Sequence, residues 1–277
     1  MFSPKSLGLV ALALAVLPLR FSAAQEFRIY TKVYDAGAAQ NIRPSVIGNS
    51  LSLFHAGKVY DHVENQHESE VIIFEPAHQR FTILSTSRSL ATTVHFDEIK
   101  HKLKLARNVT ETHVGTLLAQ KPPAAKDTVQ KVRFPIEPAF KTTIDPEGSS
   151  LQCESDHLSY RVRLAEVEEP KTSEVYLNYA DWTARLNYVL HPHALFPEPR
   201  LALNGILRST GKMPVEVELV SSIGMPIHLR AEHQIHWKLD ATDRALIHEW
   251  ESLLKSSQTR HVTFQEYQRS VLISRKD

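Results

Sequence analysis

The fold is decided by residues 51–85, which read LSLFHAGKVYDHVENQHESEVIIFEPAHQRFTILS. Two strand-forming segments lie on either side of the turn pair Ala56-Gly57, which predicts a tight hairpin. Two more flank the turn-forming segment PAHQ at residues 76–79, and they predict a second hairpin. Two hairpins in succession indicate an antiparallel β-meander.

The sequence on either side extends the meander and then changes to helix. Residues 26–34 alternate apolar and polar side chains with the period of two that is typical of a half-buried strand. Residues 90–95 favour a further strand. A helical period follows, and we expect Asp97 as its N-terminal cap and Leu118 near its end.

The second half of the chain alternates between strands and helices. Strands are predicted at 151–167, 215–220 and 227–237, helices at 173–190, 199–207 and 242–254, and either kind at 262–273. Runs of strands with helices added later favour an α+β fold. We therefore expect an antiparallel meander sheet, flat or curved into a half-barrel, with helices packed on one face.

A proline-rich segment, KPPAAK at residues 121–126, interrupts this pattern. Proline disfavours both helix and strand, so this is the best internal boundary. The predicted organisation is an export signal at 1–24, a β-meander with a helix at 25–120, and an α+β portion at 127–277. The last two parts either stand apart or form one continuous domain.

The first 24 residues have the order of a secretory signal. Residues 1–5 are short and basic, residues 7–19 are almost entirely apolar, and Ser22-Ala23-Ala24 offers the small side chains of a cleavage site. The apolar run is shorter than the roughly 20 residues of a bilayer-spanning helix. We expect export to the periplasm or the extracellular space, without a stable transmembrane anchor.

The charge balance argues against nucleic-acid binding. The chain carries 32 Lys and Arg against 31 Asp and Glu, and loss of the signal would remove Lys5 and Arg20. Proteins that bind nucleic acids usually carry a basic excess that displaces counterions from phosphate.

Cys153 is the only cysteine, so no intramolecular disulfide can form, and we expect a small buried side chain.

Histidine is the one overrepresented reactive residue, with 15 copies. His191 and His193 flank a proline that holds the backbone extended. They either form a pair aimed at one metal ion or lie as two solvated loop side chains. His228, His233 and His236 lie in one predicted strand, with His233 on the opposite face from the other two. These three therefore cannot share a metal ion.

The chain shows no catalytic motif. It has no Gly-rich phosphate loop, His-Glu-x-x-His pattern or Gly-x-Ser-x-Gly elbow, so we predict no cofactor and no catalytic residue. The predicted helix at 173–190 carries Tyr179, Trp182 and Leu186 along one stripe. These side chains either line a ligand cavity or pack in the core.

Residues 51–85, with two hairpins and an aromatic side chain near each turn, resemble the β-meander of bacterial envelope proteins with a LolA-like half-barrel. The resemblance implies a curved antiparallel sheet that cradles helices and apolar ligands. It transfers no functional residue, and the order of elements differs, because here the long helix follows the meander. The sequence as a whole is similar to exported bacterial proteins.

Three hypotheses of function remain open, and the sequence favours the two that are not catalytic. The first is a binding or carrier protein of the bacterial envelope for a lipid or another apolar ligand, with Tyr179, Trp182 and Leu186 as its contacts. The second is a structural component that binds an envelope protein. The third is a metal-dependent hydrolase that uses His191 and His193.

Overall fold

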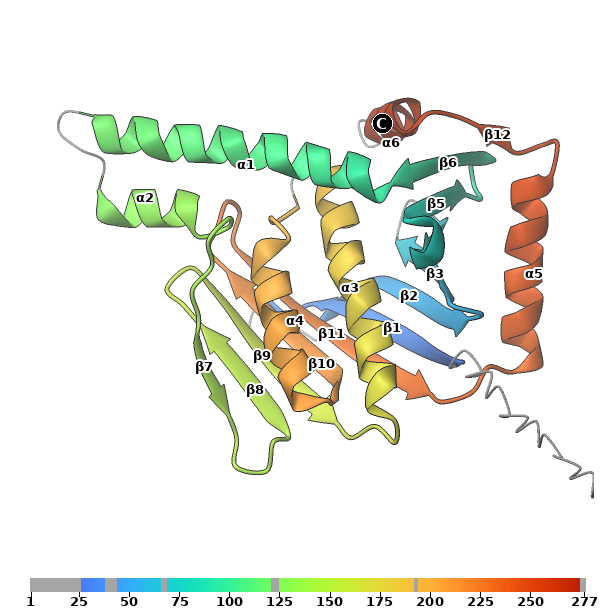
Figure 1. Cartoon of the computed structure of the whole chain (residues 1–277), viewed down its shortest axis with the longest axis horizontal. Helices are drawn as coiled ribbons and strands as arrows, with labels where there is room; N and C mark the ends of the chain where they lie inside the picture. The colour runs from blue at the N-terminus through green and yellow to red at the C-terminus, as the bar shows by residue number, and fades with distance from the viewer. Residues whose placement is uncertain (1–25, 38–43, 66–68, 121–124, 192–193, 275–277) are drawn as a thin grey trace, which may run out of the picture.

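The computed structural model describes residues 26–37, 44–65, 69–120, 125–191 and 194–274. The predicted export signal, His193 and most of the KPPAAK segment lie outside these residues. The described residues form one sheet of twelve strands together with six α-helices (Figure 1). The α+β prediction is confirmed, and the sheet is open and curved.

All neighbouring strands in the sheet are antiparallel, except β12, which pairs with β6 in parallel. The order across the sheet is β12-β6-β5-β4-β3-β2-β1-β11-β10-β9-β8-β7. The strands are β1 (Phe27–Asp35), β2 (Ser45–His55), β3 (Lys58–Asn65), β4 (Ser69–Glu75), β5 (Arg80–Ser85), β6 (Leu90–His95), β7 (Lys141–Ile144), β8 (Ser150–Glu154), β9 (Leu158–Ala165), β10 (Met213–Ser221), β11 (Ile227–His236) and β12 (Arg260–His261). The helices are α1 (Phe96–Ala119), α2 (Lys126–Arg133), α3 (Pro170–Leu190), α4 (Glu198–Thr210), α5 (Ala241–Lys255) and α6 (Phe264–Ser274).

The two predicted hairpins are confirmed. Ala56 and Gly57 both adopt positive φ, of 49° and 76°, and so form the tight turn between β2 and β3. A short 3-10 helix, η1 (Pro76–His78), joins β4 to β5, and Gln79 closes it in the left-handed conformation at φ 50°. Strands β2 to β6 therefore pair in the order of the sequence.

The structure corrects several expected boundaries. The first helix begins at Phe96 with His95 as its N-cap, and Asp97 lies in the first turn. The strand expected at 151–167 is two strands, because the Ser155 hydroxyl bonds both the N–H and the carbonyl of Leu158 and turns the chain there. Residues 262–273 fall mostly in a helix, α6. Strands β7 and β12 and helix α2 were not expected.

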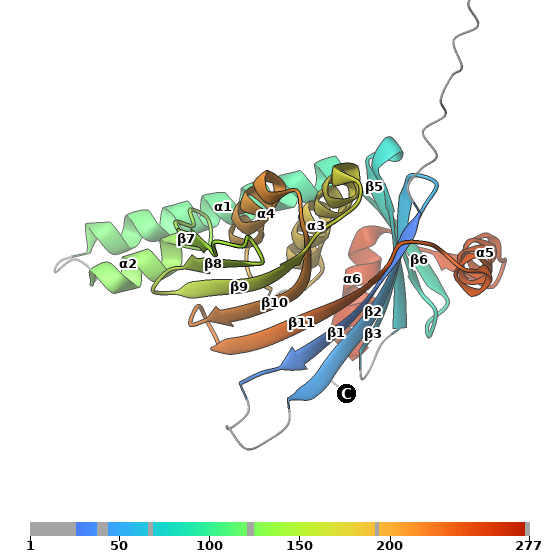
Figure 2. The same ribbon diagram turned by 90° about the horizontal axis from the view of Figure 1, so that it is seen from below.

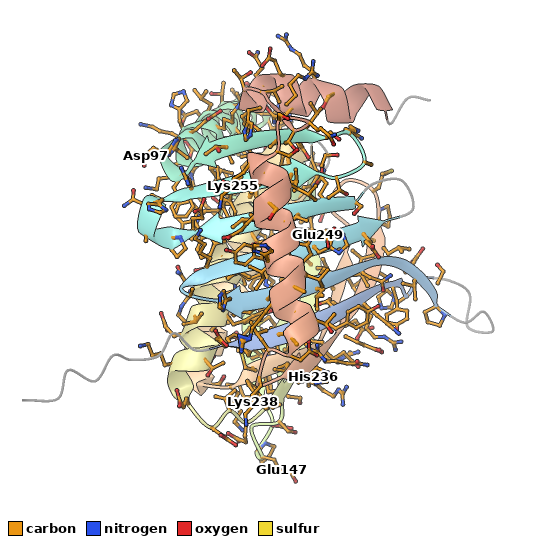
Figure 3. All side chains as sticks on the ribbon, turned by 90° about the vertical axis from the view of Figure 1, so that its right-hand side faces the viewer. Asp97, Glu147, His236, Lys238, Glu249 and Lys255 are labelled. Atoms are coloured by element: carbon orange, nitrogen blue, oxygen red, sulfur yellow. The ribbon has the colours of Figure 1, made fainter. Side chains whose placement is uncertain are left out.

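Two cores lie on opposite faces of the first half of the sheet. The neighbours Leu53 and Phe54 point to opposite faces, yet they are only 0% and 1% exposed, because both faces are covered there. Helix α5 covers the face of Leu53, where Trp250 packs on Tyr60 (Figure 3, in which Glu249 and Lys255 mark α5). This helix was predicted at residues 242–254, but the expectation that all helices pack on one face of the sheet is wrong, because α5 covers the face opposite to that of Phe54.

The second half of the sheet is covered on one face only. Helices α3 and α4, together with part of α1, pack on the concave face of the curved sheet (Figure 2). On the opposite face the strands carry charged pairs, such as Arg161 with Glu218 at 2.8 Å and Arg163 with Glu216 at 3.1 Å. This alternation places the apolar side chains of β9, β10 and β11 beneath α3 and α4.

Candidate binding cavity

A cavity of about 520 Å³ lies between the concave face of the sheet and helices α3 and α4. This volume is within the range of pockets that hold small molecules in proteins, about 300–1,000 Å³. Five strands that lie close together in the sheet, β1, β2, β3, β10 and β11, supply most of the floor, and β9 closes one end. The two helices and the segment that joins them supply the roof.

The floor consists of alternate residues of each strand. On β1 these are Ile29, Thr31 and Val33, and on β11 they include Ala231 and His233. The period of two follows from the pleat, which points every second side chain to the same face. The cavity floor is therefore set by strand register, in which Thr31 pairs with His233 on one side and with Ser50 on the other.

The largest part of the roof is one face of α3. Tyr176, Tyr179, Ala180, Thr183 and Ala184 line the cavity at spacings of three and four residues, which places them along a single side of the helix. Three of these side chains are small. Protein interiors are normally packed without voids, so a space of this size requires small side chains that face one another. On the floor, Ala231 and the serine and threonine residues supply the small side chains that face α3.

A buried carboxyl group lies at the β3 end of the cavity. Asp61 is 6% exposed, and it accepts a hydrogen bond from the Ser52 hydroxyl at 2.7 Å. Burial raises the pKa of Asp61, while hydrogen bonds from Tyr179, Ser52 and Ser50 act in the opposite direction. Burial and the neighbouring Asp61 also hold the pKa of Tyr179 well above its usual range. The strand and helix therefore share a polar cluster inside an otherwise apolar region.

His233 lies in the middle of the floor and is neutral at pH 7. Its Nδ1 forms a hydrogen bond of 2.8 Å with the Thr31 hydroxyl, and its ring packs edge-on against Tyr176. Burial, together with the positive charge of Arg200, lowers the pKa of His233 to about 4. A neutral imidazole offers one donor and one acceptor nitrogen, so it can bond a ligand without carrying charge.

This low pKa predicts an acid-sensitive fold. The unfolded chain binds a proton at His233 below about pH 6.5 and the folded protein only below about 4, so stability is lost as the pH falls through this window. Between pH 6.5 and 4.5 the loss from this group is about 2 kcal/mol. Urea unfolding across this pH range should show that His233→Gln loses about 2 kcal/mol less of its free energy of unfolding than the wild type does.

The control for this measurement is His236→Gln, an exposed position on the same strand. It should follow the wild-type pH dependence, because the titration of other groups is common to both proteins. Parallel loss of stability in the wild type and His233→Gln would contradict a buried neutral imidazole.

Arg200 and Tyr160 lie at the other end of the cavity, at β9. Arg200 stands in the first turn of α4, and its Nε donates to the Asn204 side-chain oxygen at 2.9 Å. Tyr160 is 6% exposed, and burial raises its pKa to about 12. Both side chains line the cavity, so polar groups lie at its two ends, and His233 and Thr31 lie between them in a mostly apolar floor.

Of the three side chains predicted as ligand contacts, only Tyr179 lines the cavity. Trp182 stacks on Phe96 of α1 with ring centroids 3.6 Å apart, and Leu186 is 1% exposed within the core. Helix α3 does carry one apolar stripe, but different parts of this stripe contact different neighbours. Its part near Tyr179 faces the sheet, and Trp182 faces α1.

The candidate metal residues are not both described. His191 ends α3 as its C-cap, with its N–H bonded to the Asn187 carbonyl at 3.0 Å, while His193 lies outside the described residues. In the part of the chain that the structure describes, no three His, Cys, Asp or Glu side chains gather in a metal-binding group. Cys153 is fully buried, as predicted, and burial raises the pKa of its thiol.

The other cavity residues had little signal in the sequence. Asp61 lies in a short strand just after a turn, where a carboxylate usually faces solvent, and Arg200 has the pattern of an ordinary charged residue of a helix. His233 was the exception, since alternation already placed it on the opposite face from His228. In the structure His228 pairs with Glu218 at 2.6 Å on the outer face. The available clue was a polar residue at a strand position whose side chain points to the inner face of the sheet.

No described helix is long and apolar enough to cross a lipid bilayer. A scan against models of known protein families gives no match for this sequence, and a comparison with curated proteins gives none either. The reading of the cavity therefore depends on its own geometry and chemistry.

Proposed function

We propose that this protein binds a small, mostly apolar molecule in the cavity between the sheet and helices α3 and α4. The observation that carries this proposal is an open space of about 520 Å³ with mostly apolar walls and a few polar groups. Ligand pockets usually combine these two features, because apolar surface supplies affinity and a few polar groups fix orientation. The role that fits is that of a binding or carrier protein.

Export, which the first 24 residues predict, would place this binding in the periplasm or outside the cell. A carrier there keeps an apolar molecule out of water by burying it, at about 25 cal/mol for each Å² of apolar surface. The LolA-like proteins that the meander resembles are expected to bind apolar ligands in the same general way. The resemblance supports a carrier role and says nothing of the ligand.

The proposal predicts saturable binding of a neutral apolar probe. We expect 1-aminoanthracene to bind the purified protein with one site per chain and with increased fluorescence, because the cavity shields it from water. A titration followed by fluorescence, with competition by dodecan-1-ol, measures this directly. Absence of saturable binding at pH 7 would contradict the proposed function.

A further inference from the structure

The β9 end of the cavity holds a cation without an acidic partner. Among the described residues, no carboxylate lies within ion-pair distance of the Arg200 guanidinium. Its positive charge nevertheless acts within the cavity, since it influences the ionisation of both Tyr160 and His233. Arg200 is only partly buried, so it remains in contact with water when no anion is bound, and an anion that enters the cavity meets an unpaired guanidinium.

The local hydrogen bonds hold Arg200 in place without neutralising it. Its Nε donates to the oxygen of Asn204, which is fully buried, and the Asn204 amide donates to Asp181 Oδ1 at 2.7 Å. The other oxygen of Asp181 accepts from Arg208 at 2.7 Å. Asp181 is therefore paired with Arg208, and the two terminal nitrogens of Arg200 have no protein partner among the described residues.

Tyr160 adds a second donor at the same end. Its hydroxyl has no hydrogen-bond partner in the described part of the chain, although the residue is only 6% exposed. The hydroxyl oxygen itself is not fully shielded from solvent, so it is open to the cavity and can donate a hydrogen bond to a ligand oxygen there. A planar guanidinium and a phenol hydroxyl together match the two oxygens of a carboxylate, which an arginine can bind with two parallel hydrogen bonds.

We propose that the ligand is an amphiphile with a single carboxylate, held by Arg200 and Tyr160, and with its apolar body extending along the cavity. This inference rests on the proposed function and specifies its ligand class. No lysine or arginine of the described residues lines the cavity at the Asp61 end, so the only cation available to a ligand carboxylate is Arg200. Asp61 and Tyr160 lie five strand spacings apart, about 24 Å before the curvature of the sheet, so the orientation is defined.

The test compares two molecules that differ only in the head group, sodium dodecanoate and dodecan-1-ol. Isothermal titration calorimetry at pH 7.5 should give dodecanoate an affinity about 10- to 100-fold higher than that of the alcohol. In Arg200→Met this preference should disappear, with the affinity for dodecan-1-ol unchanged. Arg200→Lys should restore part of it, because a lysine keeps the charge but loses the planar fork.

Arg161→Met is the matched control. Arg161 follows Tyr160 on β9 but lies on the outer face, where it pairs with Glu218, so the same change of charge occurs outside the cavity. It should retain the wild-type preference for dodecanoate.

Each result has a distinct meaning. Equal affinities for the acid and the alcohol, unaffected by Arg200→Met, would overturn the inference and leave the proposed function standing. Failure of dodecanoate, dodecan-1-ol and 1-aminoanthracene to bind would overturn both. Loss of dodecanoate preference in Arg161→Met as well would assign the effect to net charge and would also overturn the inference.

Discussion

The double substitution Ala180→Phe with Ala184→Phe should abolish most ligand binding while leaving the protein folded. Both alanines line the roof of the cavity, one helical turn apart on α3. Two phenyl rings there would exclude an apolar ligand from the middle of the cavity. Loss of roughly 110 Å² of buried apolar surface weakens binding by about 2.8 kcal/mol, or about 100-fold.

The expected stability of this variant separates an empty cavity from a packed core. Extra rings forced into a well-packed core cost about 1–3 kcal/mol or more, whereas rings placed in open space are tolerated. We expect the free energy of unfolding in urea to stay within about 1 kcal/mol of the wild-type value. The affinity for 1-aminoanthracene, measured on the same samples, should fall by the full factor.

The control makes the same two changes at the same spacing on α5. Ala241 and Ala245 are exposed and lie on the other side of the sheet. Ala241→Phe with Ala245→Phe should bind the probe as the wild type does. If the α3 variant also binds normally, or if it unfolds, the cavity is not the binding site that we propose.

The second large effect is expected at Asp61, where replacement by alanine should cost about 3 kcal/mol of stability at pH 7. Asp61 accepts hydrogen bonds from a buried cluster, and alanine leaves the Ser52 hydroxyl without its partner at 2.7 Å. Each buried donor left unsatisfied costs about 1–3 kcal/mol. Urea unfolding measures the loss, and exposed Asp35→Ala should change stability by no more than about 0.5 kcal/mol.

Asp61→Asn distinguishes the carboxyl charge from its hydrogen bonds. Burial raises the pKa of Asp61 in the folded protein, so binding of a proton to Asp61 stabilises the folded state. This stabilisation is lost as the pH rises through that pKa. The asparagine has no proton to lose. Relative to the wild type, Asp61→Asn should therefore become more stable as the pH increases from 4 towards 8. A constant difference across this range would show that Asp61 ionises freely.

The meander was predictable because its signals are local. A turn pair such as Ala56-Gly57 and the alternation of side chains in each strand act over a few residues, and tertiary contacts reinforced them. The break at Ser155 was missed because it depends on one hydroxyl that bonds Leu158, in a run whose alternation continues on both sides. The pairing of β1 with β11 joins segments some 200 residues apart, and no local pattern encodes it.

The cavity could not be predicted because empty space is a property of several elements together. Ala184 on α3 is unremarkable alone, and so is Ala231 on β11, but the fold places both at one cavity. The aromatic stripe misled for a related reason. Trp182 is the largest side chain on it, yet Phe96 of a different helix takes up that ring. The size and periodicity of the side chains identify the buried face of a helix. They do not show whether that face packs against other side chains or lines a cavity.

The two ends of the cavity give the site a direction. Asp61 is bonded to Ser52 and Tyr179, whereas Arg200 and Tyr160 lack partners among the described residues. A ligand carboxylate gains most at an unpaired guanidinium, because a charge-assisted hydrogen bond is stronger than a neutral one. An amphiphilic acid therefore fits this cavity better than a neutral apolar molecule of the same size.

Native mass spectrometry of the protein, purified without detergent from the cells that produce it, shows whether the cavity carries a ligand. We expect a fraction of the molecules to carry one small acidic amphiphile, released on denaturation, that is absent from Ala180→Phe with Ala184→Phe. A wild-type protein that carries no small molecule and takes up none when sodium dodecanoate is added would contradict a carrier function for this cavity.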